Sequence, residues 1–138
     1  MASRLNPYLS FGDDARPAME FYHSVFGGTL VLNTFGDLHA AQEPAENDLI
    51  MHGMLETTSG FTLMGSDTST RVQRTVGNNI TISLSGDDGE ELRGYWTKLS
   101  EGGEVTMELQ KQMWGDEFGM CTDKFGIGWM VDISQPQQ

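Results

Sequence analysis

Few side chains in this sequence are suited to catalysis, and they do not form a familiar catalytic set. Of the three histidines, His23 falls within a predicted helix, His39 within a polar loop and His52 within a predicted strand. Histidine titrates near neutral pH, so His52 is the candidate for acid–base catalysis, although a single strand histidine more often has a structural role. The chain shows no glycine-rich phosphate loop, no Ser–His–Asp set and no dinucleotide-binding fingerprint.

Methionine and glycine, in contrast, recur with a fixed spacing. One pattern of Gly-Met, Gly and Met occurs twice: Gly53-Met54, Gly60 and Met64, then Gly119-Met120, Gly126 and Met130. An acidic pair, an aromatic pair and a Gly-Gly pair precede each copy in the same order. This repeat predicts that the chain consists of two copies of one structural unit. Because methionine adapts to varied shapes, these residues are either core packing or the lining of an apolar binding site.

Alternating polar and apolar residues open each copy, which is the pattern of a half-buried strand. The polar faces are Asn6, Tyr8 and Ser10 in residues 6–11, and Asn79, Thr81 and Ser83 in residues 79–84. Ile80, Ile82 and Leu84 form the apolar face of the second strand, which a helix is expected to cover.

A helix is predicted after each of these strands. Asp14 and Asp88 are suitable N-caps, and a Gly-Gly pair at 27–28 or 102–103 ends each helix. Three extended segments then follow each helix: residues 29–35, 50–56 and 61–65, and residues 104–110, 118–122 and 127–133. Each copy is therefore predicted to be a β-α-β-β-β unit.

The length of 138 residues is that of about one domain. Two halves of about 65 residues would each be marginal alone, so we predict a single domain over 1–138. Its first module spans about 5–66, its linker about 67–77 and its second module about 78–134. The polar stretch 36–48 is a candidate lid, and Arg71 and Arg74 near the linker are either solvated or contacts for an anion.

The charge balance excludes several classes of partner. Eight basic and twenty acidic residues give a net charge of −12, which disfavours nucleic acids and anionic membranes as partners. The single cysteine, Cys121, cannot form an internal disulfide and is expected to fill space in the core. No segment resembles a signal peptide or a transmembrane helix, so a cytoplasmic protein is expected.

Several motifs together resemble one known family. They are Tyr8-Leu9-Ser10-Phe11, residues 18–22 with 25–28, Trp114-Gly115, residues 116–119, and residues 123–126 with Trp129-Met130. With the duplicated β-α-β-β-β unit, they are similar to the vicinal oxygen chelate superfamily (glyoxalase I, bleomycin-resistance proteins, extradiol dioxygenases), and within it to PhnB-like proteins. The resemblance covers about residues 5–134. It implies an α+β fold in which two tandem modules form U-shaped, mostly antiparallel sheets with helices on the outer face.

The resemblance also implies where a metal would bind. Metal-dependent members take His or Glu ligands from the first and last strands of each unit. These positions fall on Asn6 and Asn79 in the first strands and on Met64 and Met130 in the last strands. Neutral amide oxygens and thioethers are poor ligands for zinc, nickel or iron, so no metal and no cofactor are expected.

The resemblance leaves an apolar trough as the predicted site. Its expected lining is Asn6, Tyr8, Ser10, His52, Met54, Met64, Asn79, Thr81, Trp114, Phe118, Met120 and Met130. The predicted function is metal-independent binding of a small, partly apolar organic molecule. The alternatives are a metal-dependent lyase, isomerase or dioxygenase with displaced ligands, and an acid–base enzyme using His52. A third reading is an interaction module with vestigial troughs. Since superfamily members usually pair, a homodimer is expected.

Overall fold

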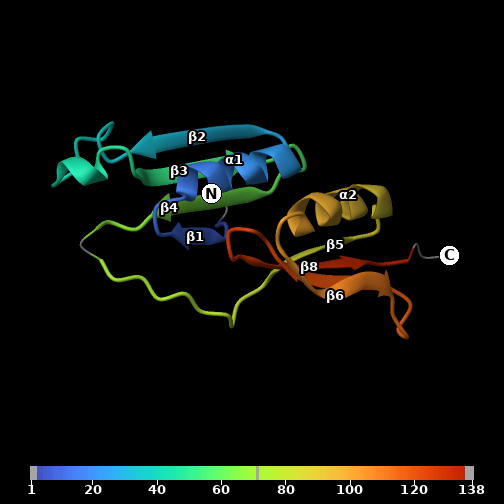
Figure 1. Ribbon diagram of the computed structural model, residues 1–138. Coiled ribbons are helices and arrows are strands. Elements are labelled where there is room, and N and C mark those ends of the chain that lie inside the picture. Colours follow the sequence, from blue (N-terminus) through green and yellow to red (C-terminus); the bar gives the residue numbers. More distant parts are fainter. Residues whose placement is uncertain (1–2, 71, 136–138) are drawn as a thin grey trace. The chain divides into compact units, whose positions relative to one another are not determined.

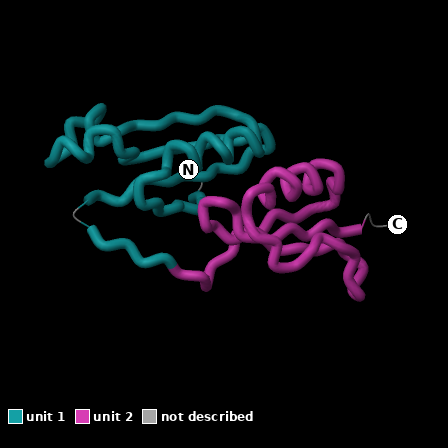
Figure 2. The backbone as a smooth tube through the Cα atoms, in the orientation of Figure 1, with its two compact units in different colours: residues 1–76 teal, residues 77–138 magenta. Residues whose placement is uncertain are grey.

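The computed structural model of the protein describes residues 3–70 and 72–135. The chain divides into two units, residues 1–76 and residues 77–138 (Figure 2). Both helices are 12 residues long. Within the described residues, neither has the length and apolar character that a membrane-spanning helix requires.

Unit 1 is a four-stranded sheet with one α-helix (Figure 1). Its elements are β1 (Tyr8–Phe11), α1 (Ala15–Phe26), β2 (Thr29–Thr34), the short helix η1 (Pro44–Glu46), β3 (Ile50–Glu56) and β4 (Thr62–Asp67). The strand order is β1-β4-β3-β2, with β1 parallel to β4 and the other pairs antiparallel. The helix contacts β2, β3 and β4.

Unit 2 repeats this arrangement. Its elements are β5 (Ile82–Gly86), α2 (Gly89–Ser100), β6 (Glu104–Lys111), β7 (Glu117–Thr122) and β8 (Gly128–Ile133). The strand order is β5-β8-β7-β6, again with the first pair parallel and the others antiparallel. The predicted α+β fold of two tandem, mostly antiparallel modules is thus confirmed.

The two helices begin differently. Asp88 caps α2 as predicted, because its carboxylate accepts a hydrogen bond from the backbone N–H of Glu91 at 3.1 Å. Asp14 stands at the N-cap of α1, but its side chain makes no capping hydrogen bond. The buried carboxylate of Asp67 takes over this role, since it accepts hydrogen bonds from the backbone N–H groups of Ala15 and Ile50, both at 2.8 Å. Asp67 therefore ties α1 to the start of β3.

Matching side chains hold the last hairpin of each unit. Gly60 and Gly126 end these turns with φ angles of 92° and 91°, a conformation that glycine adopts without strain. In unit 1, Thr57 Oγ1 accepts a hydrogen bond from the backbone N–H of Phe61 at 2.8 Å. In unit 2, the buried carboxylate of Asp123 accepts hydrogen bonds from the backbone N–H groups of Phe125 and Ile127 and from the indole N–H of Trp129.

The first strands are shorter than predicted. Asn6 precedes β1, and both Asn79 and Thr81 precede β5. Ile82 pairs with Trp129, the second residue of β8, so in this parallel register Ile80 lies beyond the end of the partner strand. Ile80 is 82% exposed for this reason, and the prediction that it shares a buried face was wrong.

The predicted lid and linker are both attached to unit 1. Within residues 36–48, the carboxylate of Glu46 is buried and accepts hydrogen bonds from the backbone N–H of Gln42 and the hydroxyl of Ser69. Arg74 donates a hydrogen bond to the backbone carbonyl of Ser10 at 3.1 Å. Arg71, the other arginine predicted as an anion contact, lies outside the described residues.

Candidate ligand-binding faces

One face of the unit 1 sheet carries most of the predicted lining of that unit. Along β1, β3 and β4 the side chains alternate, and Leu9, Leu55 and Leu63 are buried on the helix side. The alternate positions carry Tyr8, Ser10, His52, Met54 and Met64, and we call this side the open face of unit 1. Tyr8, Met64 and Met54 are direct neighbours in one row across three strands.

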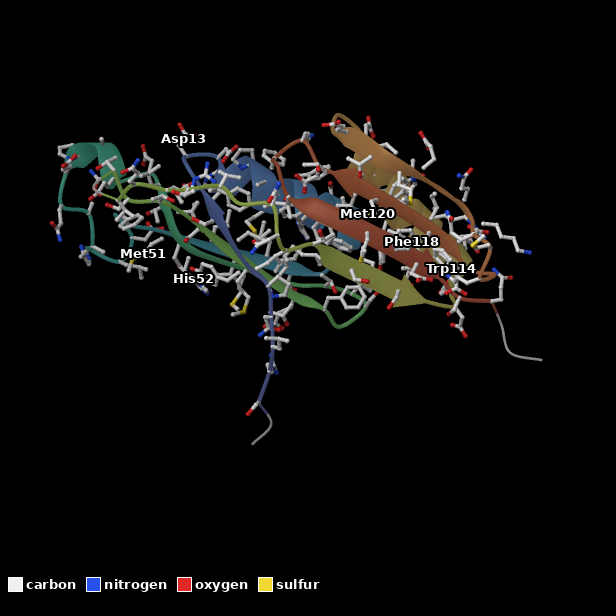
Figure 3. The ribbon with its side chains drawn as sticks, turned by 90° about the horizontal axis from the view of Figure 1, so that it is seen from below. Asp13, Met51, His52, Trp114, Phe118 and Met120 are labelled. Atoms are coloured by element: carbon white, nitrogen blue, oxygen red, sulfur yellow. The ribbon has the colours of Figure 1, made fainter. Side chains whose placement is uncertain are left out.

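Unit 2 has a corresponding open face. Ser83, Met130 and Met120 form the equivalent row across β5, β8 and β7. Phe118 also lies on β7, and Trp114 lies in the connection between β6 and β7 (Figure 3). Trp114 is 59% exposed, and its ring meets that of Phe118 edge to face, with 6.0 Å between centroids.

A β-bulge directs His52 to the open face. The pairing of β2 with β3 shifts between Asn33 and Thr34, so that Met51 is an extra residue between Ile50 and His52. Ile50 is fully buried, whereas His52 is half-buried on the other side of the sheet. In a regular strand without the bulge, strict alternation would place Ile50 and His52 on the same face. Figure 3 shows Met51 and His52 side by side on β3.

Tyr8 and His52 form the polar part of the open face of unit 1. The hydroxyl of Tyr8 lies 3.3 Å from Nδ1 of His52. Their rings are stacked, with 5.8 Å between centroids and 29° between planes. Ser10, on the same strand as Tyr8, has its hydroxyl 3.3 Å from that of Thr68. The open face of unit 1 therefore combines hydrogen-bonding groups with two methionines.

The carboxyl groups of Asp116 and Asp132 interact in unit 2, and the sequence did not predict this contact. Burial, a hydrogen bond with Asp116 and the negative charge of Asp116 raise the pKa of Asp132 above its ordinary value. Asp132 is opposite Phe118 in the register of β7 and β8. The sequence pattern does not reveal this pair, because Asp116 and Asp132 are 16 positions apart in the chain. Glu56, the strand-end carboxylate of β3, is exposed.

The residues at the family's metal positions do not fit a metal. Tyr8 pairs with Met64 in β4, and Ser83 pairs with Met130 in β8. Tyr8 and Ser83 are therefore equivalent residues of the two units, and they are 75 positions apart in the chain. Thr81, rather than Asn79, therefore corresponds to Asn6, and the predicted equivalence of Asn6 and Asn79 was wrong. The corrected set still contains only neutral oxygen donors and thioethers. Within residues 3–70 and 72–135, no three His, Cys, Asp or Glu side chains lie close enough together to hold a metal ion.

Cys121 is a core residue, as predicted. Its side chain is 3% exposed, and burial together with the negative charge of Asp123 raises the pKa of the thiol to about 11. Since the thiolate is the reactive form of cysteine, this thiol is unsuited to nucleophilic catalysis.

The tandem β-α-β-β-β units, each with a helix on one face of a mixed sheet, define the class of this protein. The model of the Glyoxalase/Bleomycin resistance protein/Dioxygenase superfamily matches residues 4–131, and the chain belongs to this family.

Particular relatives span nearly the whole chain. Protein YjdN of Escherichia coli (strain K12) is 29% identical over 144 residues, which cover 96% of this chain and 97% of YjdN. The crystal structure of protein PA1353 from Pseudomonas aeruginosa is similar with a TM-score of 0.85 and 39% identity, over 98% of this chain and 100% of that one. The structure of a PhnB protein from Bacillus cereus is similar with a TM-score of 0.76, over 96% of this chain and 100% of that one. Its identity of 21% supports a shared fold alone.

Proposed function

We propose that this protein binds a small, partly apolar organic molecule on its open faces without the help of a metal ion. The observation that carries the proposal is the pairing of Met54 with Met64 and of Met120 with Met130 at the centre of each sheet. All four side chains are only half-buried. Flexible thioether side chains at this position offer an adaptable apolar surface to a ligand.

Polar groups beside the methionines support the same proposal. Small-molecule sites combine mostly apolar walls with a few hydrogen-bonding groups that orient the ligand. In unit 1 these groups are the hydroxyls of Tyr8 and Ser10 and the imidazole of His52. In unit 2, Trp114 and Phe118 extend the apolar surface, and Ser83 supplies a hydroxyl. Asn6, Asn79 and Thr81 precede the strands, so they belong to the rim of the proposed sites.

Metal independence is proposed from the chemistry of the donors. Met64 and Met130 stand where metal-binding relatives carry a carboxylate, and a thioether is a ligand only for soft metals. Tyr8 and Ser83, their partners on the first strands, carry neutral hydroxyls. A lyase, isomerase or dioxygenase would need a ligand set at another place, and the described residues contain no cluster for it.

An acid–base enzyme is the second candidate, and the contact between Tyr8 and His52 favours it. General acid–base catalysis needs a group with a pKa near the working pH, held in a fixed orientation. Stacking on Tyr8 orients the imidazole of His52. If His52→Ala abolished turnover of a bound compound while leaving its affinity unchanged, catalysis would replace simple binding as the function.

Assembly and location complete the proposal. We propose a homodimer, because members of this superfamily usually pair, and a sedimentation mass equal to one chain would contradict it.

The net charge of −12 supports the absence of nucleic acid and anionic membrane partners. A cytoplasmic location is supported by the use of a single, unpaired cysteine.

A titration with an apolar fluorescent probe tests the proposal. Phenylnaphthylamine is uncharged and becomes fluorescent when it enters an apolar site. We expect saturable binding, with the same dissociation constant before and after treatment with EDTA. Absence of saturable binding would contradict the proposed apolar site. Loss of binding with EDTA, restored by a divalent metal, would contradict metal independence.

A further inference from the structure

The hydrogen bond between Tyr8 and His52 determines which nitrogen of His52 carries the proton. A neutral imidazole has one nitrogen that donates and one that accepts. The hydroxyl of Tyr8 lies 3.3 Å from Nδ1 of His52, and because a phenol is a stronger acid than a neutral imidazole N–H, this contact favours the tautomer in which the hydroxyl donates and Nδ1 accepts. The proton of His52 is then on Nε2.

This Nε2–H group is available to a ligand. Within residues 3–70 and 72–135, the Tyr8 hydroxyl is the hydrogen-bond partner of the His52 ring, through Nδ1, and Nε2 has none. His52 is half-buried and lies on the same face of β3 as Met54, whose neighbour across the sheet is Met64. A donor beside two thioether side chains suits an oxygen acceptor on an apolar molecule.

The charges near His52 indicate that this acceptor is uncharged. The four strands of unit 1 contain no lysine or arginine, and Arg74, which the structure places against β1, donates a hydrogen bond to the backbone carbonyl of Ser10. Glu56 lies on the open side of β3, and the whole chain carries a net charge of −12. An anionic ligand would be repelled at this face.

We propose that the open face of unit 1 selects apolar molecules with an uncharged oxygen acceptor, such as a ketone or an amide, which receives a hydrogen bond from Nε2 of His52. Tyr8 acts as a positioning residue, because it holds His52 in the donating tautomer. This inference rests on the proposed function, since it names the ligand class of the same site.

The duplication supplies an internal comparison for this assignment. Ser83 takes the place of Tyr8 opposite the last-strand methionine, and Phe118 takes the place of His52 at the repeat offset of 66 positions. Unit 2 therefore lacks the imidazole donor and the phenol that orients it. The preference for an acceptor oxygen is assigned to unit 1 alone.

The tautomer is tested first, without any ligand. In nitrogen NMR of the histidine side chains at neutral pH, we expect His52 to carry its proton on Nε2 in the wild-type protein. Tyr8→Phe removes only the hydroxyl and should shift His52 toward a mixture of tautomers, while the signals of His23 and His39 stay unchanged. A predominantly Nδ1-protonated His52 in the wild type would overturn the proposal.

Two matched probes then test the selection. The dye prodan is an apolar naphthalene with a ketone, whereas phenylnaphthylamine is an apolar naphthalene without an acceptor oxygen. We expect His52→Phe to weaken prodan binding about fivefold, the effect of one neutral hydrogen bond, and Tyr8→Phe to weaken it about twofold. Both variants should weaken phenylnaphthylamine binding less than prodan binding, and Met113→Ala, at a position that is 98% exposed, should bind both probes as the wild type does.

The outcomes separate this inference from the proposed function. If wild-type protein binds both probes and the variants affect both equally or neither, the selection by His52 is wrong while the apolar site remains. If the wild type binds neither probe, both the proposed function and the inference are wrong. Saturable phenylnaphthylamine binding shows that the variants are folded, so a loss that is clearly larger for prodan than for phenylnaphthylamine supports the inference.

Discussion

Met54 and Met64 lie directly opposite each other on β3 and β4, and Met120 and Met130 lie directly opposite each other on β7 and β8. The same pair therefore occupies the same place in both sheets. On the helix side of these strands, Leu55 and Val131 are fully buried, whereas the four methionines are half-buried. The methionines thus contribute to a surface as well as to packing.

Shortening one methionine of each pair should weaken the binding of an apolar molecule. For the double variant Met64→Ala, Met130→Ala, we expect the affinity for phenylnaphthylamine to fall by about 1 kcal/mol or more, which is about fivefold, because apolar contact area is lost. Met113→Ala is the control, since Met113 is 98% exposed and lies outside both methionine pairs. Equal affinities of all three proteins would contradict a role for the methionines in binding.

Removing the carboxylate of Asp67 should destabilise unit 1. Asp67→Ala leaves the buried backbone N–H groups of Ala15 and Ile50 without an acceptor. We expect the free energy of unfolding in urea to fall by about 2–4 kcal/mol. Asp67→Asn restores one acceptor and should lose less, and Asp48→Ala, at an exposed position, should change little. Equal stability of the Asp67 and Asp48 variants would show that this bridge does not hold α1 to β3.

The carboxyl pair of unit 2 should make stability depend on pH. The pKa of Asp132 is raised in the folded protein, so the folded state binds a proton more tightly than the unfolded state. This contribution to stability is fully present below the ordinary pKa of about 3.9 and is lost as the pH rises through the raised value. Asp132→Asn should therefore be stabilised relative to the wild type at neutral pH, and this gain should disappear at acidic pH.

The pair also allows a double-mutant test of that prediction. Asp116→Asn removes the repulsion but leaves Asp132 charged and partly buried, so it should give a smaller gain at neutral pH in a urea titration. The double variant should then gain little more than Asp132→Asn alone, because both substitutions remove the same repulsion. Gains that add fully, or that do not change with pH, would show that the two carboxyl groups do not interact.

Local patterns predicted much of this fold. The alternation in β1, the glycines of the final hairpins and the repeated Gly-Met spacing depend on neighbouring residues, and each is confirmed. The start of β5 was missed because it depends on where β8 begins, 46 positions further along the chain. The capping of α1 by Asp67 was missed for the same reason, since Asp14 offers a suitable local cap that the tertiary structure does not use.

The candidate site was predicted in part. Tyr8, Ser10 and His52 were named from the sequence together with Met54 and Met64, and the structure brings them onto one face. The place of His52 depends on the bulge at Met51, which no local pattern announced, because Ile50 and His52 both fit a regular strand. That these residues bind a ligand stays a prediction.

The central claim is that thioethers have replaced a metal site in both units. Its most direct test is the metal content of the native protein, purified without chelators and analysed by mass spectrometry of its elements. We expect each divalent metal to be far below one ion per chain, with full binding of phenylnaphthylamine in the same sample. One tightly bound zinc, nickel, iron or manganese ion per chain, or one per unit, would contradict the claim.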